Sequence, residues 1–395
     1  MRTPLALDFD NWIRNDFRAM NTALEDLYFA SEDPDSVAGV GESIKEALVA
    51  EGREHITQLL KEGNTDEGFD QGFDLLGDVG FYMAACRRHG ITDPSRETRS
   101  PLVEASALAM QLGASLGAVP RFASSHLETH NSAINGVYKT FTTLDDEKLF
   151  IEYNTRGVFG YIRAAEALLH TLPLGVSHPV TRDLLDVARG ALDDVFNSNA
   201  ELFRALDTRR FFYSIRPYYK PHRVGLREYR GANAGDFAGI NVIDLLLGLC
   251  RADDPYYSQL LVDKFLFMRP EDQLLLRDCM RRKSLLSSFL DVVAGHRNED
   301  WFQRNASAFL DVCKAHAKVA RQHHEQLVER FIVRPAAEAG LEDKADLSAS
   351  GPPLPVLLKG LQVLCDLRCA APRDDIPSRY HDITLLEQAC REPAR

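Results

Sequence analysis

Residues 315–336 read AHAKVARQHHEQLVERFIVRPA, and the pattern of this stretch decides the fold. Apolar residues recur in it at intervals of three and four, which is the spacing of an amphipathic helix. His324 lies on the apolar face, whose other members are Ala320, Leu327, Val328 and Phe331. The adjacent His323 is turned about 100° away from that face. The imidazole of His324 could therefore reach a metal, or it could belong to a buried histidine bonded to a carbonyl group.

The same helical spacing continues along almost the whole chain, and sustained alternation of apolar and polar residues is rare. The spacing predicts an all-α fold with helices over residues 10–30, 38–62, 68–90, 101–115, 145–172, 180–207, 237–250, 256–267, 270–293, 299–338 and 354–370. Helix-breaking residues cluster in 92–101, 217–239 and 340–355. We predict a small N-terminal helical domain over 1–115 and a large helical domain over 116–395. The cluster at 217–239 is long enough for a binding loop, and the cluster at 340–355 for a lid or a linker.

Composition excludes several classes of function for this 395-residue chain. Its formal net charge of −12 argues against a nucleic-acid partner, which needs a basic face. No segment has the pattern of a secretory signal or the length of a membrane span, so we expect a cytoplasmic protein with no membrane partner. The seven cysteines are scattered, as expected for reduced thiols. Cys365 and Cys369 stand one helical turn apart, but no second close pair of Cys or His completes a zinc site.

The residues after His324 carry the most specific signal in the chain. Residues 324–336 resemble the proximal-histidine helix of the indoleamine 2,3-dioxygenase superfamily, which reads His-x-Gln-aliphatic-Val-x-basic-aromatic-Ile-x-x-Pro-Ala. The resemblance implies that His324 is the axial ligand of a haem iron. It also implies that Arg321 meets a haem propionate and pairs with an aspartate on a neighbouring helix. Some members of the superfamily bind haem covalently through a His-x-x-x-Cys motif. None of the histidines here is followed by cysteine four residues later, so the resemblance implies haem b held without a covalent bond.

Two central segments resemble the same superfamily. Residues 211–218 match its aromatic-aromatic-x-x-aliphatic-Arg-x-Tyr segment, which implies that Phe211 and Phe212 flank an aromatic substrate. Arg216 would then bind a substrate carboxylate, since a guanidinium binds carboxylates bidentately. Without the resemblance, aromatic core residues and a surface arginine would be the preferred interpretation.

Residues 230–248 resemble the superfamily's glycine-rich loop, which enters a helix with an Asp-x-Leu-Leu-Gly run. The match implies that Asp244 is the partner of Arg321. It also implies that Ala234, Gly235 and Asp236 line the substrate side of the haem. The chain departs from the pattern here, because relatives usually have Gln-Ser-Ser where this chain has Asp-Phe-Ala at 236–238. The departure puts the standard tryptophan-cleaving chemistry in doubt.

Other segments are more similar to the monodechloroaminopyrrolnitrin synthase (PrnB-type) branch of the superfamily. They are residues 216–225, which read RPYYKPHRVG, and residues 77–90. Residues 119–126 loosely resemble the segment that approaches the distal pocket, which makes His126 a candidate for proton transfer. A core or surface histidine is the alternative at that position.

The resemblance implies a haem-dependent oxygenase of specialised metabolism. Its partners would be dioxygen and a small aromatic substrate such as tryptophan, a tryptophan derivative or an indole. The reaction would be a PrnB-like oxidation and rearrangement or a 2,3-dioxygenation. The alternatives are a non-catalytic haem-binding, small-ligand-binding or sensor protein, and a helical interaction scaffold.

Overall fold

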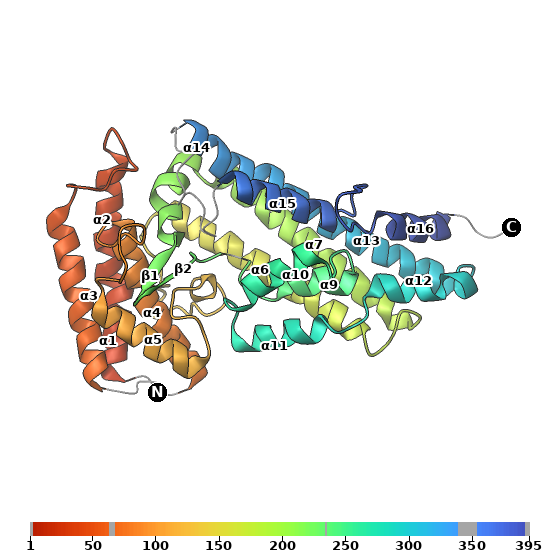
Figure 1. Cartoon of the computed structure of the whole chain (residues 1–395), viewed down its shortest axis with the longest axis horizontal. Coiled ribbons are helices and arrows are strands. Elements are labelled where there is room, and N and C mark those ends of the chain that lie inside the picture. Colours follow the sequence, from red (N-terminus) through yellow and green to blue (C-terminus); the bar gives the residue numbers. More distant parts are fainter. Residues whose placement is uncertain (1–2, 63–67, 234, 339–353, 392–395) are drawn as a thin grey trace. The chain divides into compact units, whose positions relative to one another are not determined.

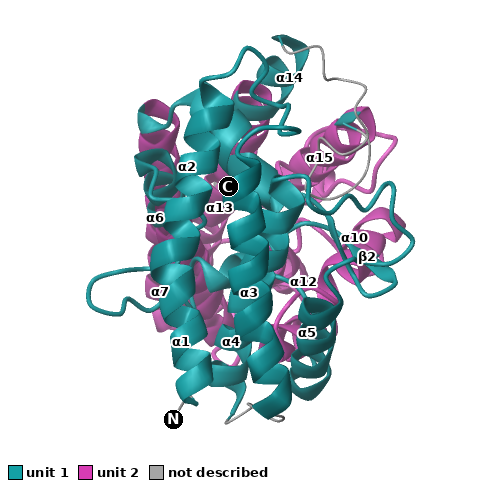
Figure 2. Ribbon diagram, turned by 90° about the vertical axis from the view of Figure 1, so that its left-hand side faces the viewer, with its two compact units in different colours: residues 1–152, 205–236, 331–354 teal, residues 153–204, 237–330, 355–395 magenta. Residues whose placement is uncertain are grey.

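The computed structural model describes residues 3–62, 68–233, 235–338 and 354–391. It is built almost entirely of helices, which confirms the predicted all-α class (Figure 1). Contacts divide the chain into two compact units, drawn in different colours in Figure 2. Unit 1 comprises residues 1–152, 205–236 and 331–354, and unit 2 comprises 153–204, 237–330 and 355–395. The whole predicted N-terminal domain, residues 1–115, lies within unit 1 together with these later segments.

Unit 1 begins with helices that surround α4. Its described elements are α1 (Pro4–Trp12), η1 (Ile13–Phe17), α2 (Arg18–Phe29), α3 (Glu42–Glu62), α4 (Phe69–Arg88), α5 (Val103–Leu116), η2 (Ser124–His126), α8 (Thr208–Arg210), η3 (Phe211–Ile215), η4 (Arg216–Tyr219), β1 (His222–Val224), β2 (Arg227–Tyr229) and α14 (Arg334–Glu338). Almost every residue of α4 from Gly72 to Cys86 is buried, so this helix forms the centre of the core. Gly80 is required there, because a Cβ atom would lie 2.5 Å from the backbone nitrogen of Phe122. The loop before η2 is thereby packed directly on α4.

Unit 2 is a helical bundle. Its elements are α7 (Pro179–Ala205), α9 (Gly239–Leu247), α10 (Pro255–Phe265), α11 (Pro270–Cys279), α12 (Leu285–His296), α13 (Asp300–Gln322), α15 (Leu354–Arg368) and α16 (Tyr380–Arg391), with the greater parts of α6 (Asp145–Thr171) and η5 (His323–Val333). Local sequence signals set several of these ends. Asp254 caps α10 ahead of Pro255, and Gly248 ends α9 in the left-handed conformation at φ 76°.

The structure differs from the predicted elements in three places. The predicted helix over 270–293 is two helices, α11 and α12, which are separated by residues 280–284. The predicted loop at 217–239 contains an antiparallel hairpin in which His222 pairs with Tyr229. The helix α16 was not predicted, and most of the predicted breaker segment at 340–355 lies outside the described residues. Within the described part of the chain, no helix combines the length and the apolar character needed to span a bilayer.

Candidate functional site

The predicted helix over 299–338 is present, but its hydrogen bonding changes at the histidine pair. The α-helical bonding of α13 ends at Gln322, and the π-helix η5 starts at His323. Turns of π-helix widen the helix locally and are frequent at functional sites. The helical hydrogen bonding therefore changes from α to π at His323, the residue before His324.

Burial along this segment agrees with the predicted sidedness. Val328 and Phe331 are buried, and His324 is partly buried. His323 is exposed. The imidazole of His324 thus lies on the inward side of the segment, as the spacing of apolar residues predicted.

A pocket of about 420 Å³ adjoins His324 within unit 2. Its lining consists of His324, Glu325, Val328 and Glu329 from η5 and Leu358 and Gln362 from α15. Pockets that hold small molecules and cofactors have volumes of roughly 300–1,000 Å³, so this volume falls in their range. The Nδ1 atom of His324 is buried and has no hydrogen-bond partner among the described residues. A buried imidazole nitrogen without a partner beside such a pocket fits the role of a metal ligand.

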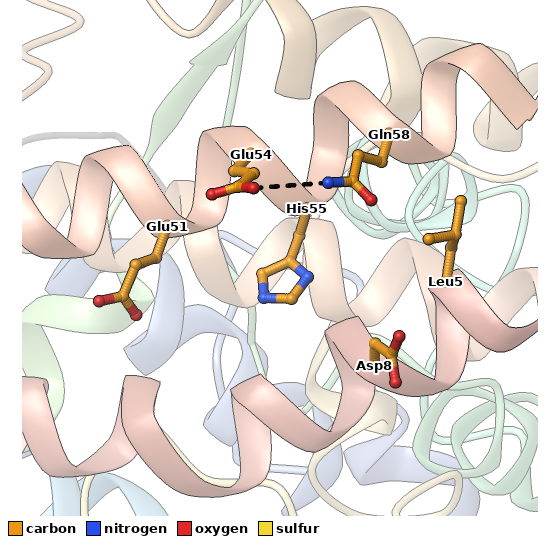
Figure 3. A pocket seen from close by; sticks show the side chains of 6 residues that line it. All are labelled: Leu5, Asp8, Glu51, Glu54, His55 and Gln58. Carbon is orange, nitrogen blue, oxygen red and sulfur yellow. Dashed lines mark hydrogen bonds between the residues drawn. The ribbon is translucent and has the colours of Figure 1, made fainter.

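A second pocket, of about 210 Å³, lies between α1 and α3 in unit 1 (Figure 3). Its lining is mostly acidic and polar: Leu5, Asp8, Glu51, Glu54, His55 and Gln58. Glu51 already accepts a hydrogen bond from the indole of Trp12 at 2.7 Å. None of the predicted site residues contributes to this pocket.

Asp244 is at the centre of a buried polar network in unit 2. Its carboxylate accepts hydrogen bonds from Tyr257 Oη at 2.8 Å and from His316 Nε2 at 2.7 Å. Arg368 binds it through Nε at 2.9 Å and Nη2 at 2.7 Å. Burial raises the pKa of Asp244, but Arg368 and His316 outweigh that effect and hold the pKa well below its usual value. Asp244 is therefore an ionised, fully satisfied group.

The predicted pairing of Arg321 with Asp244 is wrong in this structure, because Arg368 takes that place. Helix geometry gives the reason. Arg321 follows His316 by five residues on α13, which turns it about 140° away from the face that meets Asp244. Arg321 is exposed and interacts with the thiol of Cys369.

The predicted substrate-binding aromatics lie together on η3 in unit 1. Phe211 is 7% exposed and packs against the rings of Phe150 and Phe331, with centroid distances of 4.9 and 5.8 Å. Arg216 places its guanidinium 5.2 Å from the centre of the Phe212 ring, within the range of a cation–π contact. All three side chains are therefore buried, with Phe211 packed on other rings and Arg216 against the ring of Phe212.

The glycine-rich loop holds Asp236 in an ion network within unit 1. Its carboxylate binds Arg121 at 2.9 Å and Arg230 at 2.6 Å, and its side chain is 1% exposed. The backbone N–H of Gly235 donates to the side chain of Asn233 at 2.8 Å. The carboxylate of Asp236 is therefore engaged by arginines of its own unit, while Ala234 lies outside the described residues.

His126 has the features of a core histidine. Its Nδ1 accepts a hydrogen bond from the backbone N–H of Ala123 at 3.0 Å, and its Nε2–H donates to the carbonyl of Phe73 at 2.8 Å. Burial, reinforced by the charge of Lys139, lowers its pKa to about 3. With both ring nitrogens bonded to the backbone, His126 has none left for proton transfer to a substrate, so the predicted catalytic role lacks a physical basis.

Sequence reasoning did not identify Arg368 and His316 as members of the Asp244 network. His316 precedes His324 by eight residues, so its place near the inward face of the same helix was a usable signal. Arg368 is 124 residues away from Asp244, and no local pattern connects the two.

The comparison with known proteins identifies the family. Residues 3–390 match the family described as monodechloroaminopyrrolnitrin synthase PrnB. The match covers nearly the whole chain and agrees with the similarity noted in residues 77–90 and 216–225. The chain belongs to the PrnB family of enzymes, within the superfamily of the indoleamine and tryptophan 2,3-dioxygenases.

Proposed function

We propose that this protein is a haem-dependent oxygenase that acts on an aromatic, tryptophan-derived substrate in specialised metabolism. Membership of the PrnB family supports the class of enzyme. The observation that carries the cofactor assignment is His324, whose buried Nδ1 has no partner among the described residues and whose side chain lines a pocket. Haem b, bound without a covalent link, would supply the iron that reacts with dioxygen.

The residues around His324 are suited to hold a cofactor. Val328 and Leu358 give its pocket an apolar part against which a porphyrin could pack. Arg321 stands three residues before His324 and is exposed, so we assign it to a propionate group. Asp244 supports the site indirectly, because its bond to His316 fixes the helix that leads into His324.

We assign substrate recognition to Phe211, Phe212 and Arg216. Two buried aromatic rings provide a surface on which an indole can stack. The guanidinium of Arg216 would bind the carboxylate of an amino-acid substrate and exclude analogues that lack it. The chain's role is then to orient the substrate and to keep water away from it.

The test is the absorbance spectrum and iron content of the full chain reconstituted with haem b. We expect a Soret band and about one haem per chain in the native protein and in His323→Ala, since His323 is exposed. His324→Ala should lose both. Equal haem content and the same spectrum in the two variants would remove His324 as the ligand.

Oxygen uptake then separates an enzyme from a haem sensor. The reduced holoprotein is offered tryptophan, chlorinated tryptophan and indole, and the products are analysed by mass spectrometry. Gain of two oxygen atoms indicates dioxygenation, and other mass changes indicate monooxygenation or rearrangement. A protein that binds haem and consumes no oxygen with any aromatic compound would contradict the proposed activity.

A further inference from the structure

Two cysteines lie next to each other at the C-terminal end of α15 in unit 2. The Sγ atoms of Cys365 and Cys369 are 4.0 Å apart. The backbone N–H of Cys369 donates to the carbonyl of Cys365 at 2.9 Å, so the two residues close the last turn of the helix. The Cys369 thiol also donates to the carbonyl of Ala317 on α13 at 3.7 Å.

The backbone at this point permits a bond between the two sulfur atoms. Residues four apart in a helix have Cα atoms about 6 Å apart, within the usual range of disulfides. Their Cβ atoms are about 5–6 Å apart, beyond the roughly 3.5–4.5 Å of a disulfide, so the terminal turn has to close by about 1–2 Å. The helix α15 ends at Arg368, so Cys369 lies just beyond it, and Ala370 follows with a φ of 44° in the left-handed region. A rotation of the Cys369 side chain, with a small shift of the terminal turn, therefore disturbs little of the helix.

Cys369 differs chemically from the other cysteines of the described chain. The hydrogen bond from Cys365 and the nearby guanidinium of Arg321 lower the pKa of its thiol to about 7. Burial raises the pKa of the thiols elsewhere, namely Cys86, Cys250, Cys279, Cys313 and Cys390. A thiolate is the form that attacks peroxides, so Cys369 is the most reactive thiol of the set.

We propose that Cys365 and Cys369 form a reversible disulfide when the protein meets hydrogen peroxide. The Cys369 thiolate attacks one peroxide oxygen, the O–O bond breaks, and the departing hydroxide takes up a proton to become water. The sulfur of Cys365 then attacks the sulfenic acid at Cys369, the S–O bond breaks and a second water leaves. The two thiols lose two electrons, peroxide is reduced to two molecules of water, and a dithiol reductant reverses the reaction.

Disulfide formation would change the contacts next to the Asp244 network. Cys369 directly follows Arg368, whose guanidinium binds Asp244, and disulfide formation removes the thiol that donates to Ala317. Oxidation would therefore remove a contact to α13, the helix that carries His316 and ends just before His323 and His324.

Digestion with trypsin tests the bond directly, because cleavage after Arg368 separates the two cysteines. The full chain without haem is treated with one equivalent of peroxide, remaining thiols are alkylated, and the digest is analysed by mass spectrometry. We expect peptides 360–368 and 369–373 as one cross-linked species, two hydrogens lighter than their sum, which dithiothreitol separates. Cys369 should be oxidised at least about tenfold faster than Cys313.

Matched variants complete the experiment. Cys365→Ser should leave a sulfenic acid on Cys369 that a dimedone probe captures, and Cys390→Ser should form the cross-link as the native chain does. Free, alkylated Cys369 after peroxide treatment would overturn the proposal. So would a cross-link between Cys369 and a different cysteine or a second copy of the chain.

Discussion

Arg368 binds both carboxylate oxygens of Asp244, with its Nε 2.9 Å from Oδ1 and its Nη2 2.7 Å from Oδ2. The side chain of Asp244 is fully buried and that of Arg368 is 13% exposed. Removing one partner of such a pair leaves the other charge buried without compensation. This ion pair ties α15 to α9 inside unit 2.

The arginine that supports Asp244 can be identified by stability. Arg368→Met should lower the free energy of unfolding by about 3–5 kcal/mol, because it isolates the Asp244 carboxylate. Arg321→Met, which removes an exposed guanidinium, should lower it by less than about 1 kcal/mol. Urea unfolding followed by circular dichroism measures both. A larger loss in Arg321→Met than in Arg368→Met would restore Arg321 as the partner.

Asp236 offers a test between a structural and a substrate-binding role. Asp236→Asn should cost about 3–5 kcal/mol of stability, since it leaves Arg121 buried without its counter-ion. The matched control is Asp253→Asn, which breaks the exposed pair with Arg251 and should leave the unfolding midpoint nearly unchanged. If Asp236→Asn is as stable as the native chain and only substrate affinity falls, the carboxylate serves the substrate instead.

Because of His126, the free energy of unfolding should decrease as the pH falls. Its pKa falls from the model-compound value of 6.5 to about 3 in the fold, so the unfolded state binds a proton that the folded state rejects. Stability is therefore lost as the pH falls from about 6.5 towards 3. Between pH 6.5 and 5 the loss from this group is about 2 kcal/mol.

The contribution of His126 is measured as a difference between two proteins. Glu128 acts in the opposite direction, because burial raises its pKa to about 8 and its folded form retains a proton that the unfolded form loses. His126→Gln should remove only the histidine contribution. Urea midpoints at pH 6.5 and pH 5 should then fall less in the variant than in the native chain. Parallel pH profiles would show that His126 is free to ionise in the fold.

Arg216 should determine which substrates bind. Arg216→Gln should raise KM by about 10- to 100-fold for an aromatic amino acid, since a charge-assisted bidentate pair is lost. KM for an indole without a carboxylate should change little. Steady-state oxygen uptake with both substrates makes the comparison, and equal effects on the two would place Arg216 outside carboxylate recognition.

Local sequence patterns were sufficient to predict most helices and the orientation of the histidine pair. Apolar spacing predicted most of the helices and placed His324 on the inward side and His323 on the outward side, because burial follows the period of a helix. The same spacing could not indicate that the hydrogen bonding changes to a π-helix at His323, since that depends on how the segment packs.

For the predicted site, too, local sequence was sufficient for some residues and insufficient for others. Phe211, Phe212 and Arg216 are close in sequence, so one sequence motif identified all three. The loop residue Asp236 and the core residue His126 are also identifiable from sequence, but their partners Arg121 and Phe73 are distant along the chain. Without those partners, sequence reasoning assigned Asp236 to the substrate side of the haem and His126 to proton transfer.

The sequence by itself determined the all-α class, the family and the candidate ligand His324, because each depends on residues that are neighbours along the chain. Only the tertiary structure decided that Arg368 instead of Arg321 neutralises Asp244, and that both nitrogens of His126 are bonded to backbone. Ion pairs and buried hydrogen bonds form between groups that folding brings together, and their energies depend on burial, which a linear sequence does not contain.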